Sequence, residues 1–327
     1  YKWEAKLSIP ELELIVQMAD FFDTSVDVLL GYEVKDNRLE ATVKRLQEYR
    51  RKKDWEGLAE AEKALKKYPH SFRIVNESAA IYRSFGFERG DKALFQRALA
   101  LSEQSLPLLP QNEDPEISEQ TIYGKIAQTY FGLDETDKGI ELLKKHNAGG
   151  LYNHQIGQVL ALCDRIEEAA PYLSEALAKI VNDLCATVIG YLNVYLQRKD
   201  YASAEAVLRW GIDVFSGLKK NERPNLLDKV NSIFLAALAS VQFEMGRSGE
   251  ASEFLKKAKE LAEFFDADPS YDESDIRFID RIQGASAHDD VGATAMIAVE
   301  STANQGENEA FTALWNSIKN EEETDRE

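Results

Sequence analysis

Small residues recur along this chain at two fixed steps, twelve positions and then seven. Four sets follow this rule: Ala127, Gly139 and His146; Gly157, Ala169 and Ala176; Leu192, Ala204 and Gly211; Ala239, Ala251 and Ala258. A larger residue comes three positions after the first member of each set, and a leucine comes sixteen positions after it. Where two helices cross, small side chains let the backbones approach closely, and larger ones fill the flanking grooves. The spacing therefore predicts a row of antiparallel helix pairs.

The rest of the chain also favours an almost wholly helical fold. Apolar residues recur with a period near 3.6, prolines number only 8, and no alternating β-branched run suggests a strand. Short polar segments such as LDETD, CDRIE, RKDYA and MGRSG separate the two helices of a pair. A weaker copy of the pattern surrounds Ala79 and Ala98, and a poorer one surrounds Gly57 and Ala61.

These steps resemble those of the tetratricopeptide repeat family over residues 38–262, in about six units. The resemblance implies an all-α, right-handed superhelix of helix pairs whose first helices line a concave face that binds a partner. The distances between units depart from the family, which indicates lengthened helices. His146 and Leu192 also stand where the family has small residues.

The opening segment carries a different pattern, WEAKLSIPELELIVQMADFFDTSVDVLLGYE. Trp3-Glu4, Pro10, Ala19 and the Ser25-Val26-Asp27-Val28-Leu29-Leu30 run resemble the C-terminal half of an Xre-type, lambda-repressor-like helix-turn-helix domain. The resemblance implies a DNA-binding head over residues 1–33, of which the first two helices and most of the recognition helix are not in this sequence. It also implies that Lys2 and Lys6 lie near DNA phosphates; ordinary solvated lysines are the alternative.

Elementary rules predict two short helices within residues 11–31. Pro10 suits the first turn of a helix, and an apolar stripe follows it at Leu12, Ile15, Val16 and Ala19. Ser25 suits the N-cap of the second helix, and Gly31 suits its end. Trp3 is expected to pack against the stripe.

One face of the expected first helices is rich in amides and carries Gln128, His154, Gln158, Asn193 and Gln197. Amides donate and accept hydrogen bonds, so such a face suits the backbone of an extended peptide. A helix-turn-helix joined to tetratricopeptide repeats is similar to the peptide-responsive quorum-sensing regulators of Gram-positive-type bacteria, in which asparagines of a repeat groove hold a signal peptide. The alternative is that these amides only face water.

Charge and composition limit the partners. The formal net charge is −18 and the pI is about 4.8, so phosphate backbones are repelled unless basic residues are segregated. The run KRLQEYRRKKDW is locally basic, and it is either a solvated helix end or a contact for phosphate or an acidic partner. No membrane span and no secretory signal are evident, and the 2 cysteines suggest neither a disulfide framework nor a metal site, which favours the cytoplasm.

The segment after the repeats begins at DADPSYDESD and contains further helices. Its last expected helix has an apolar face with Phe311, Leu314, Trp315 and Ile318. We expect residues 34–267 to form the repeats and residues 268–327 to form a helical cap or a surface for a homodimer, followed by an acidic tail.

Motifs for enzyme chemistry are absent from the sequence: there is no GxGxxG, GxxxxGK[ST], HExxH or GxSxG. The nearest group is His288, Asp289 and Asp290, which the acidic first turn of a helix explains equally well. We therefore expect no enzyme activity, cofactor or metal. The sequence favours a DNA-binding transcriptional regulator whose repeats sense a peptide or protein, with a repeat scaffold or a dimerisation module as alternatives.

Overall fold

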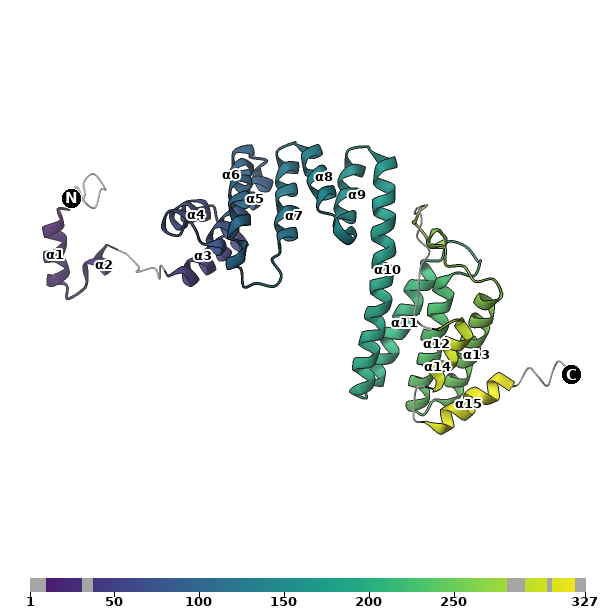
Figure 1. The fold of residues 1–327 in the computed structure, drawn as a ribbon. Coiled ribbons are helices and arrows are strands. Elements are labelled where there is room, and N and C mark those ends of the chain that lie inside the picture. Colours follow the sequence, from purple (N-terminus) through teal and green to yellow (C-terminus); the bar gives the residue numbers. More distant parts are fainter. Residues whose placement is uncertain (1–9, 31–37, 281–291, 305–307, 321–327) are drawn as a thin grey trace. The chain divides into compact units, whose positions relative to one another are not determined.

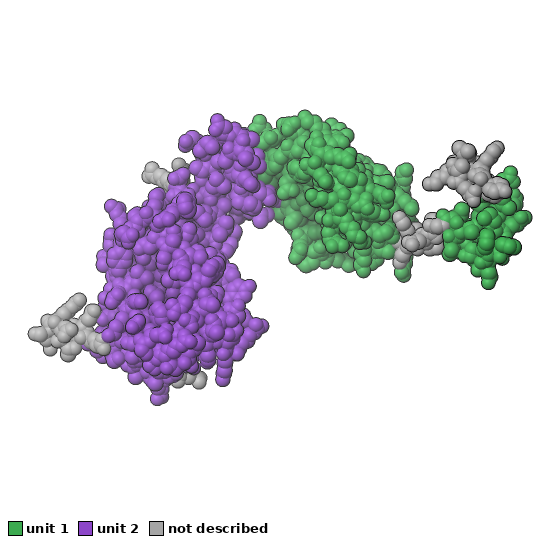
Figure 2. Space-filling view, turned by 180° about the vertical axis from the view of Figure 1, so that it is seen from behind, with its two compact units in different colours: residues 1–146 green, residues 147–327 purple. Residues whose placement is uncertain are grey.

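The computed structural model describes residues 10–30, 38–280, 292–304 and 308–320. These residues form helices and turns, with one isolated antiparallel bridge between Lys219 and Ile276. The chain divides into two compact units, residues 1–146 and 147–327, which are coloured separately in Figure 2. The division at residues 33 and 267 remains a prediction.

Unit 1 contains eight of the α-helices of the described residues (Figure 1). They are α1 (Leu12–Phe21), α2 (Val26–Leu29), α3 (Leu39–Lys52), α4 (Glu56–Lys67), α5 (Phe72–Arg89), α6 (Lys92–Ser105), α7 (Glu119–Gly132) and α8 (Thr136–Lys145), with a 3-10 turn η1 (Leu106–Gln111) after α6. From α3 onward they form three successive pairs.

The α1–α2 hairpin agrees with the expected pair of short helices. The Oγ atom of Ser25 accepts a hydrogen bond from the backbone N–H of Val28 at 3.2 Å, which is the predicted cap. Ile15 and Ala19 are buried, but Leu12 and Val16 of the predicted stripe are exposed. Lys2, Trp3, Lys6 and Gly31 lie outside the described residues.

Aromatic side chains organise the core of α3 to α7. Trp55 stacks on Phe85 with 4.4 Å between ring centroids. Phe95 of α6 fills the space that a side chain at Gly86 or Gly132 would need, so both neighbouring helices approach this ring closely. Ser118 and Thr121 form a capping box that starts α7.

Unit 2 contains the remaining helices of the described residues (Figure 1). They are the 3-10 turn η2 (Ala148–Gly150), α9 (Asn153–Leu162), α10 (Ile166–Gln197), α11 (Tyr201–Gly217), α12 (Leu226–Glu244), α13 (Ser248–Ala267), the 3-10 turn η3 (Glu273–Asp275), α14 (Ala295–Asn304) and α15 (Glu309–Asn320).

Helix α10 differs from the expected row of separate pairs. The second helix of the Gly157 pair and the first helix of the Leu192 pair are one continuous helix of 32 residues. Neither a proline nor a glycine interrupts the middle of the segment, so nothing in the sequence forces a turn there; Pro171 lies within the first two turns, and Gly190 lies near the end. Helix α9 packs against α10, and so does α11.

The predicted close crossings are present. A Cβ atom at Gly157 would lie 2.6 Å from Cγ of Leu173, the leucine that follows at the sixteenth position. One at Gly139 would meet the ring of Phe131 and lie 3.0 Å from the carbonyl oxygen of Ala127. At His146 the structure departs from the small-residue rule, because the imidazole stacks on the Tyr123 ring with 3.6 Å between centroids.

The C-terminal helices pack inside unit 2. Helix α14 contacts α12 and α13, and α15 contacts α13 and α14. Phe311, Trp315 and Ile318 are buried there, so the apolar face of the last helix is covered within the chain. The buried ammonium of Lys229 donates to the carbonyl oxygen of Gly292 at 2.7 Å and ties this segment to α12.

Candidate functional site on the first helices of unit 1

The first helices of the three pairs in unit 1, α3, α5 and α7, form one layer, since α5 contacts both α3 and α7. We call the side of this layer that carries Arg50, Glu77, Arg83, Lys125 and Gln128 the α3–α5–α7 face. Helices α4, α6 and α8 are the second helices of these pairs. In a repeat array the first helices provide the surface that meets a partner.

The α3–α5–α7 face carries more positive than negative charge at its centre. Nε of Arg50 donates to Oε1 of Glu77 at 2.6 Å, so this buried carboxylate already has a cationic partner. Arg83 lies one turn and a half further along α5, and its Nη1 atom is buried with no hydrogen-bond partner among the described residues. A buried donor without a partner costs stability.

The ionisation of the two other cations reflects this crowding. Burial, together with the positive charge of Arg50, lowers the pKa of Arg83 to about 10, and Glu77 opposes the shift. Burial and the charge of Arg83 lower the pKa of Lys125. An anion bound beside Arg83 and Lys125 would restore favourable contacts to both groups.

A pocket of about 380 Å³ adjoins this cationic centre. Its polar lining comes from α3, α5 and the segment 112–117 that precedes α7, and besides its amides it holds four carboxylates and one guanidinium: Glu40, Gln47, Arg73, Asn76, Glu77, Asn112, Glu113 and Asp114. The amide of Gln111 fastens this segment to the start of α5: its Oε1 accepts from the N–H of Phe72 at 3.1 Å, and its Nε2 donates to the carbonyl of His70. These hydrogen bonds hold the segment before α7 against the start of α5, and the pocket lies between them at the surface.

The structure separates the amides that the sequence groups on one face. Gln128 is exposed on α7 of unit 1, three positions from Lys125. His154 and Gln158 are exposed on α9, whose C-terminal end leads into the start of α10. Asn193 and Gln197 are exposed at the opposite end of α10, roughly 40 Å along the helix axis at 1.5 Å per residue.

Within unit 2 these four side chains therefore do not form one stripe. The expectation assumed a new first helix beside α9, and the continuous α10 removes that arrangement. Whether any of the five residues binds a peptide remains a prediction.

Sequence reasoning missed Arg83 and Lys125. The amide-rich face was chosen from the position that follows the first small residue of each set, together with the positions four residues before and four residues after that position. Extended to the weaker copy that begins at Ala79, this rule includes Asn76, which lines the neighbouring pocket. The cost of leaving Arg83 without a partner has no sequence signal, because it depends on burial.

Three of the six cations in the basic run of α3 form ion pairs within the chain. Arg45 pairs with Glu60 at 2.8 Å, Arg50 with Glu77, and Lys52 with Glu48 at 2.6 Å. The helix-end explanation also receives support, because Arg50, Arg51 and Lys52 occupy the last turn of α3.

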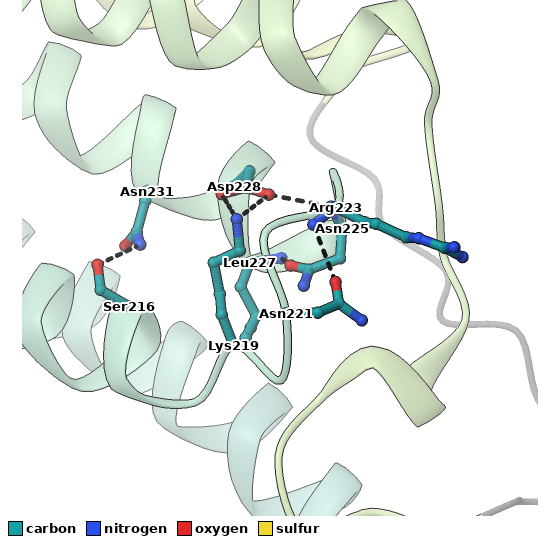
Figure 3. A network of polar contacts seen from close by, with 8 residues as sticks. All are labelled: Ser216, Lys219, Asn221, Arg223, Asn225, Leu227, Asp228 and Asn231. Carbon is teal, nitrogen blue, oxygen red and sulfur yellow. Dashed lines mark hydrogen bonds and ion pairs between the residues drawn. The ribbon is translucent and has the colours of Figure 1, made fainter.

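A second polar network, in unit 2, has a structural role (Figure 3). Nζ of Lys219 lies 2.7 Å from Oδ1 of Asp228, and the N–H of Asn225 donates to Oδ2 of the same carboxylate at 3.0 Å. Asn225 in turn caps α12. The charges of Lys219 and Asp228 satisfy one another and hold the turn between α11 and α12. Nδ2 of Asn225 and Oδ1 of Asn231 are buried without a hydrogen-bond partner among the described residues.

Two further expectations concern chemistry and membranes. His288, Asp289 and Asp290 lie outside the described residues, and the described residues contain no group of His, Cys, Asp and Glu arranged to hold a metal ion. Among the described helices, α10 and α12 are long and apolar enough to cross a membrane. Helix α12 is mostly buried in the core, whereas α10 is mostly not buried, and two such helices are weak evidence because helices of a protein core pass the same test.

Comparison with known proteins adds little to this geometry. No protein-family model and no curated protein matches the chain. The TPR-like repeats of a kinesin-light-chain-type protein from Podosopora anserina align at 16% identity over 71% of this chain and 98% of that one, with a TM-score of 0.28. BtubC (BKLC) from P. vanneervenii aligns at 15% identity over 78% and 99%, with a TM-score of 0.25.

The fold is tetratricopeptide-like. Because both TM-scores are low, this assignment rests on the all-α helix pairs and on their small-residue crossings at Gly139 and Gly157. The tetratricopeptide-like fold carries no activity by itself.

Proposed function

We propose that this chain is a repeat scaffold that binds a protein or peptide segment with a carboxylate group through the α3–α5–α7 face, in the cytoplasm and without catalysing a reaction. The observation that carries the proposal is the buried, unpartnered Nη1 of Arg83 next to Lys125. A carboxylate from a partner would supply the missing acceptor. The overall charge of −18 makes such a cationic centre a selective place for an acidic group.

The neighbouring pocket adds polar contacts for the rest of the segment. Asn76 and Gln47 line it, and Gln128 lies on the same helix as Lys125. Four carboxylates also line the pocket, so the part of the segment that enters it should be neutral or basic. Amides at these positions suit the backbone of an extended chain. The expected ligand is therefore a short extended segment with a carboxylate near Arg83.

The test is a peptide-display selection against the chain, followed by affinity measurements on the selected peptides. Wild type should select segments with Asp, Glu or a free C-terminus at one fixed position, and Arg83→Met should weaken their binding at least tenfold. Lys63→Met on α4 removes one exposed positive charge outside the face and is the matched control. Equal binding by R83M and wild type would refute the proposal.

A second candidate function is DNA-binding transcriptional regulation, with the repeats as the sensing part. It is favoured by the capped α1–α2 hairpin, in which five large apolar side chains are more than half exposed. They are Leu12, Phe21, Phe22, Val28 and Leu30. Two helices this short do not bury an apolar core alone, so the other helices of a helix-turn-helix head would cover them.

This candidate is tested with the full gene product rather than with the repeats. Selection from fragmented genomic DNA should enrich one site with two related half-sites, and adding a selected acidic peptide should change the affinity. Binding that is equally strong on every fragment, or absent, would leave only the scaffold function.

A further inference from the structure

Helix α10 carries an apolar stripe with the spacing of a coiled coil. The positions alternate in steps of four and three: Ile166, Ala170, Leu173, Leu177, Ile180, Leu184, Thr187, Tyr191 and Val194. Such a spacing keeps apolar side chains on one side of a helix over its whole length, where a second helix can pack against them.

Three apolar side chains in the second half of this stripe are largely uncovered by the described residues of unit 2. Ile180 is 56% exposed, Tyr191 53% and Val194 40%, whereas the adjacent side of the helix, with Val181 and Val188, is buried and Leu184 packs in part against that core. No charged side chain occurs from Leu184 to Gln197, in a chain with 29% charged residues. Exposed apolar surface that lacks charge is typical of the centre of a protein interface.

The continuous helix explains why the stripe is left open. In unit 1 the second helix of each pair packs against the first helix of the next pair, as α4 does with α5 and α6 with α7. In unit 2 these two partners are the N-terminal and C-terminal halves of α10. A straight helix cannot fold back on itself, so each half lacks the neighbour that the repeat pattern provides elsewhere.

We infer that a second copy of this chain supplies the missing neighbour. Two α10 helices that lie antiparallel around a two-fold axis near the middle of the helix place the C-terminal half of each against the N-terminal half of the other. This restores the contact between consecutive repeats twice, through one self-complementary surface. The repeat pattern also sets the direction, because consecutive helices in the array are antiparallel.

The first experiment is sedimentation velocity of residues 1–327 over a wide concentration range. Wild type should reach twice the chain mass of 36.9 kDa, and I180K/Y191K should remain a single chain at the same concentrations. N182K/A186K adds the same charge on exposed positions away from the stripe, and it should dimerise like wild type. Melting curves by circular dichroism check that all three proteins are folded, and lysine is compatible with a helix.

Three results would overturn the inference. Wild type could remain a single chain at every concentration, which would mean that the stripe is covered within the chain. The I180K/Y191K variant could dimerise as well as wild type, which would place the interface elsewhere. Finally, wild type could bind neutral phospholipid vesicles while remaining a single chain in solution, which would make a bilayer the partner.

A distance measurement tests the direction of the helices. A spin label at Arg198→Cys, with Cys163 and Cys185 replaced, should give a separation of roughly 40 Å or more in the dimer if the helices are antiparallel. Parallel helices bring the two labels close together. A short separation would contradict the exchange of repeat contacts.

Discussion

Arg83 shows how a single side chain can favour binding at the expense of stability. Its guanidinium is mostly buried, its Nη1 atom has no acceptor among the described residues, and Glu77, the carboxylate that raises its pKa, is already paired with Arg50. Folding therefore removes Arg83 from water without a full set of hydrogen bonds in return. Under the proposed function, a carboxylate of the partner supplies the acceptor that Arg83 lacks in the free fold.

Replacing Arg83 with methionine should stabilise the free protein or leave it unchanged, with a gain of up to about 1 kcal/mol in the free energy of unfolding. Methionine keeps the apolar stem of the side chain and removes the desolvated charge. Urea unfolding of wild type and R83M measures the difference. A clear loss of stability in R83M would show that the guanidinium has a structural partner and would remove the reason for a ligand.

Glu62 is expected to make stability depend on pH. Burial alone would raise its pKa, but hydrogen bonds from Arg97 and from the hydroxyl of Tyr82 outweigh burial and lower the pKa below 4.5. A carboxyl group with a lowered pKa in the folded state contributes stability above its unfolded pKa and loses it as the pH falls through the folded value. The contribution is below about 1 kcal/mol, since both side chains of the ion pair are about 40% exposed.

The measurement is the difference in unfolding free energy between wild type and Glu62→Gln. Wild type should be the more stable protein at pH 7, and its advantage should shrink as the pH falls from about 5 to about 3. Glu103→Gln, at an exposed glutamate of α6, is the control and should show little change. A difference that stays constant through this range would mean that Glu62 acts by shape rather than by charge.

At the scale of the element, the small-residue rule explains how the helices pair. A side chain at Gly139 would meet the Phe131 ring and the Ala127 carbonyl, although alanine is a better helix former than glycine. The rule succeeds because a close crossing tolerates few residue types, which leaves a clear pattern in the sequence. His146 fits for another reason, since its flat ring stacks on Tyr123.

Gly139→Ala should therefore destabilise the protein by roughly 1–3 kcal/mol, because the neighbouring backbone cannot move away freely. Gly249→Ala is the matched control: nothing lies within 4 Å of a Cβ atom there, and the residue is helical in α13. This control should be neutral or stabilised by up to about 1 kcal/mol. Thermal or urea unfolding of both variants gives the comparison, and equal behaviour would contradict a close crossing at Gly139.

The sequence was less informative about how pairs are joined. Small-residue spacing predicts each crossing, but it does not state whether the second helix of one pair and the first helix of the next are separated by a turn. In α10 no helix-breaking residue stands in the middle of the segment, and the two helices continue into one. For the same reason the proposed amide face, with Gln158 and Asn193, was assembled from positions that the structure holds far apart.

For the whole molecule, each compact unit has its own hydrophobic core. Phe85 and Leu46 lie at the centre of the core of unit 1, and Phe234 and Trp315 are fully buried in unit 2. A core with fully buried aromatic side chains is what an independently folding domain requires.

We therefore expect residues 38–146 and residues 147–320, expressed separately, to unfold cooperatively, with melting temperatures close to those of the same units in the whole chain. Circular dichroism melting and urea titration measure this. A non-cooperative transition in either fragment would show that its core depends on the rest of the chain.

The unbroken course of α10 also has a mechanical consequence. A turn between two helices absorbs a small tilt of one of them by rotating a few backbone dihedrals, whereas α10 has no turn over its 32 residues. It therefore acts as a lever arm: a tilt of about 5° imposed at the α9 end moves the α11 end by roughly 4 Å over a length near 48 Å. A movement of α9 therefore shifts the end of α10 that contacts α11, because no turn between them absorbs it.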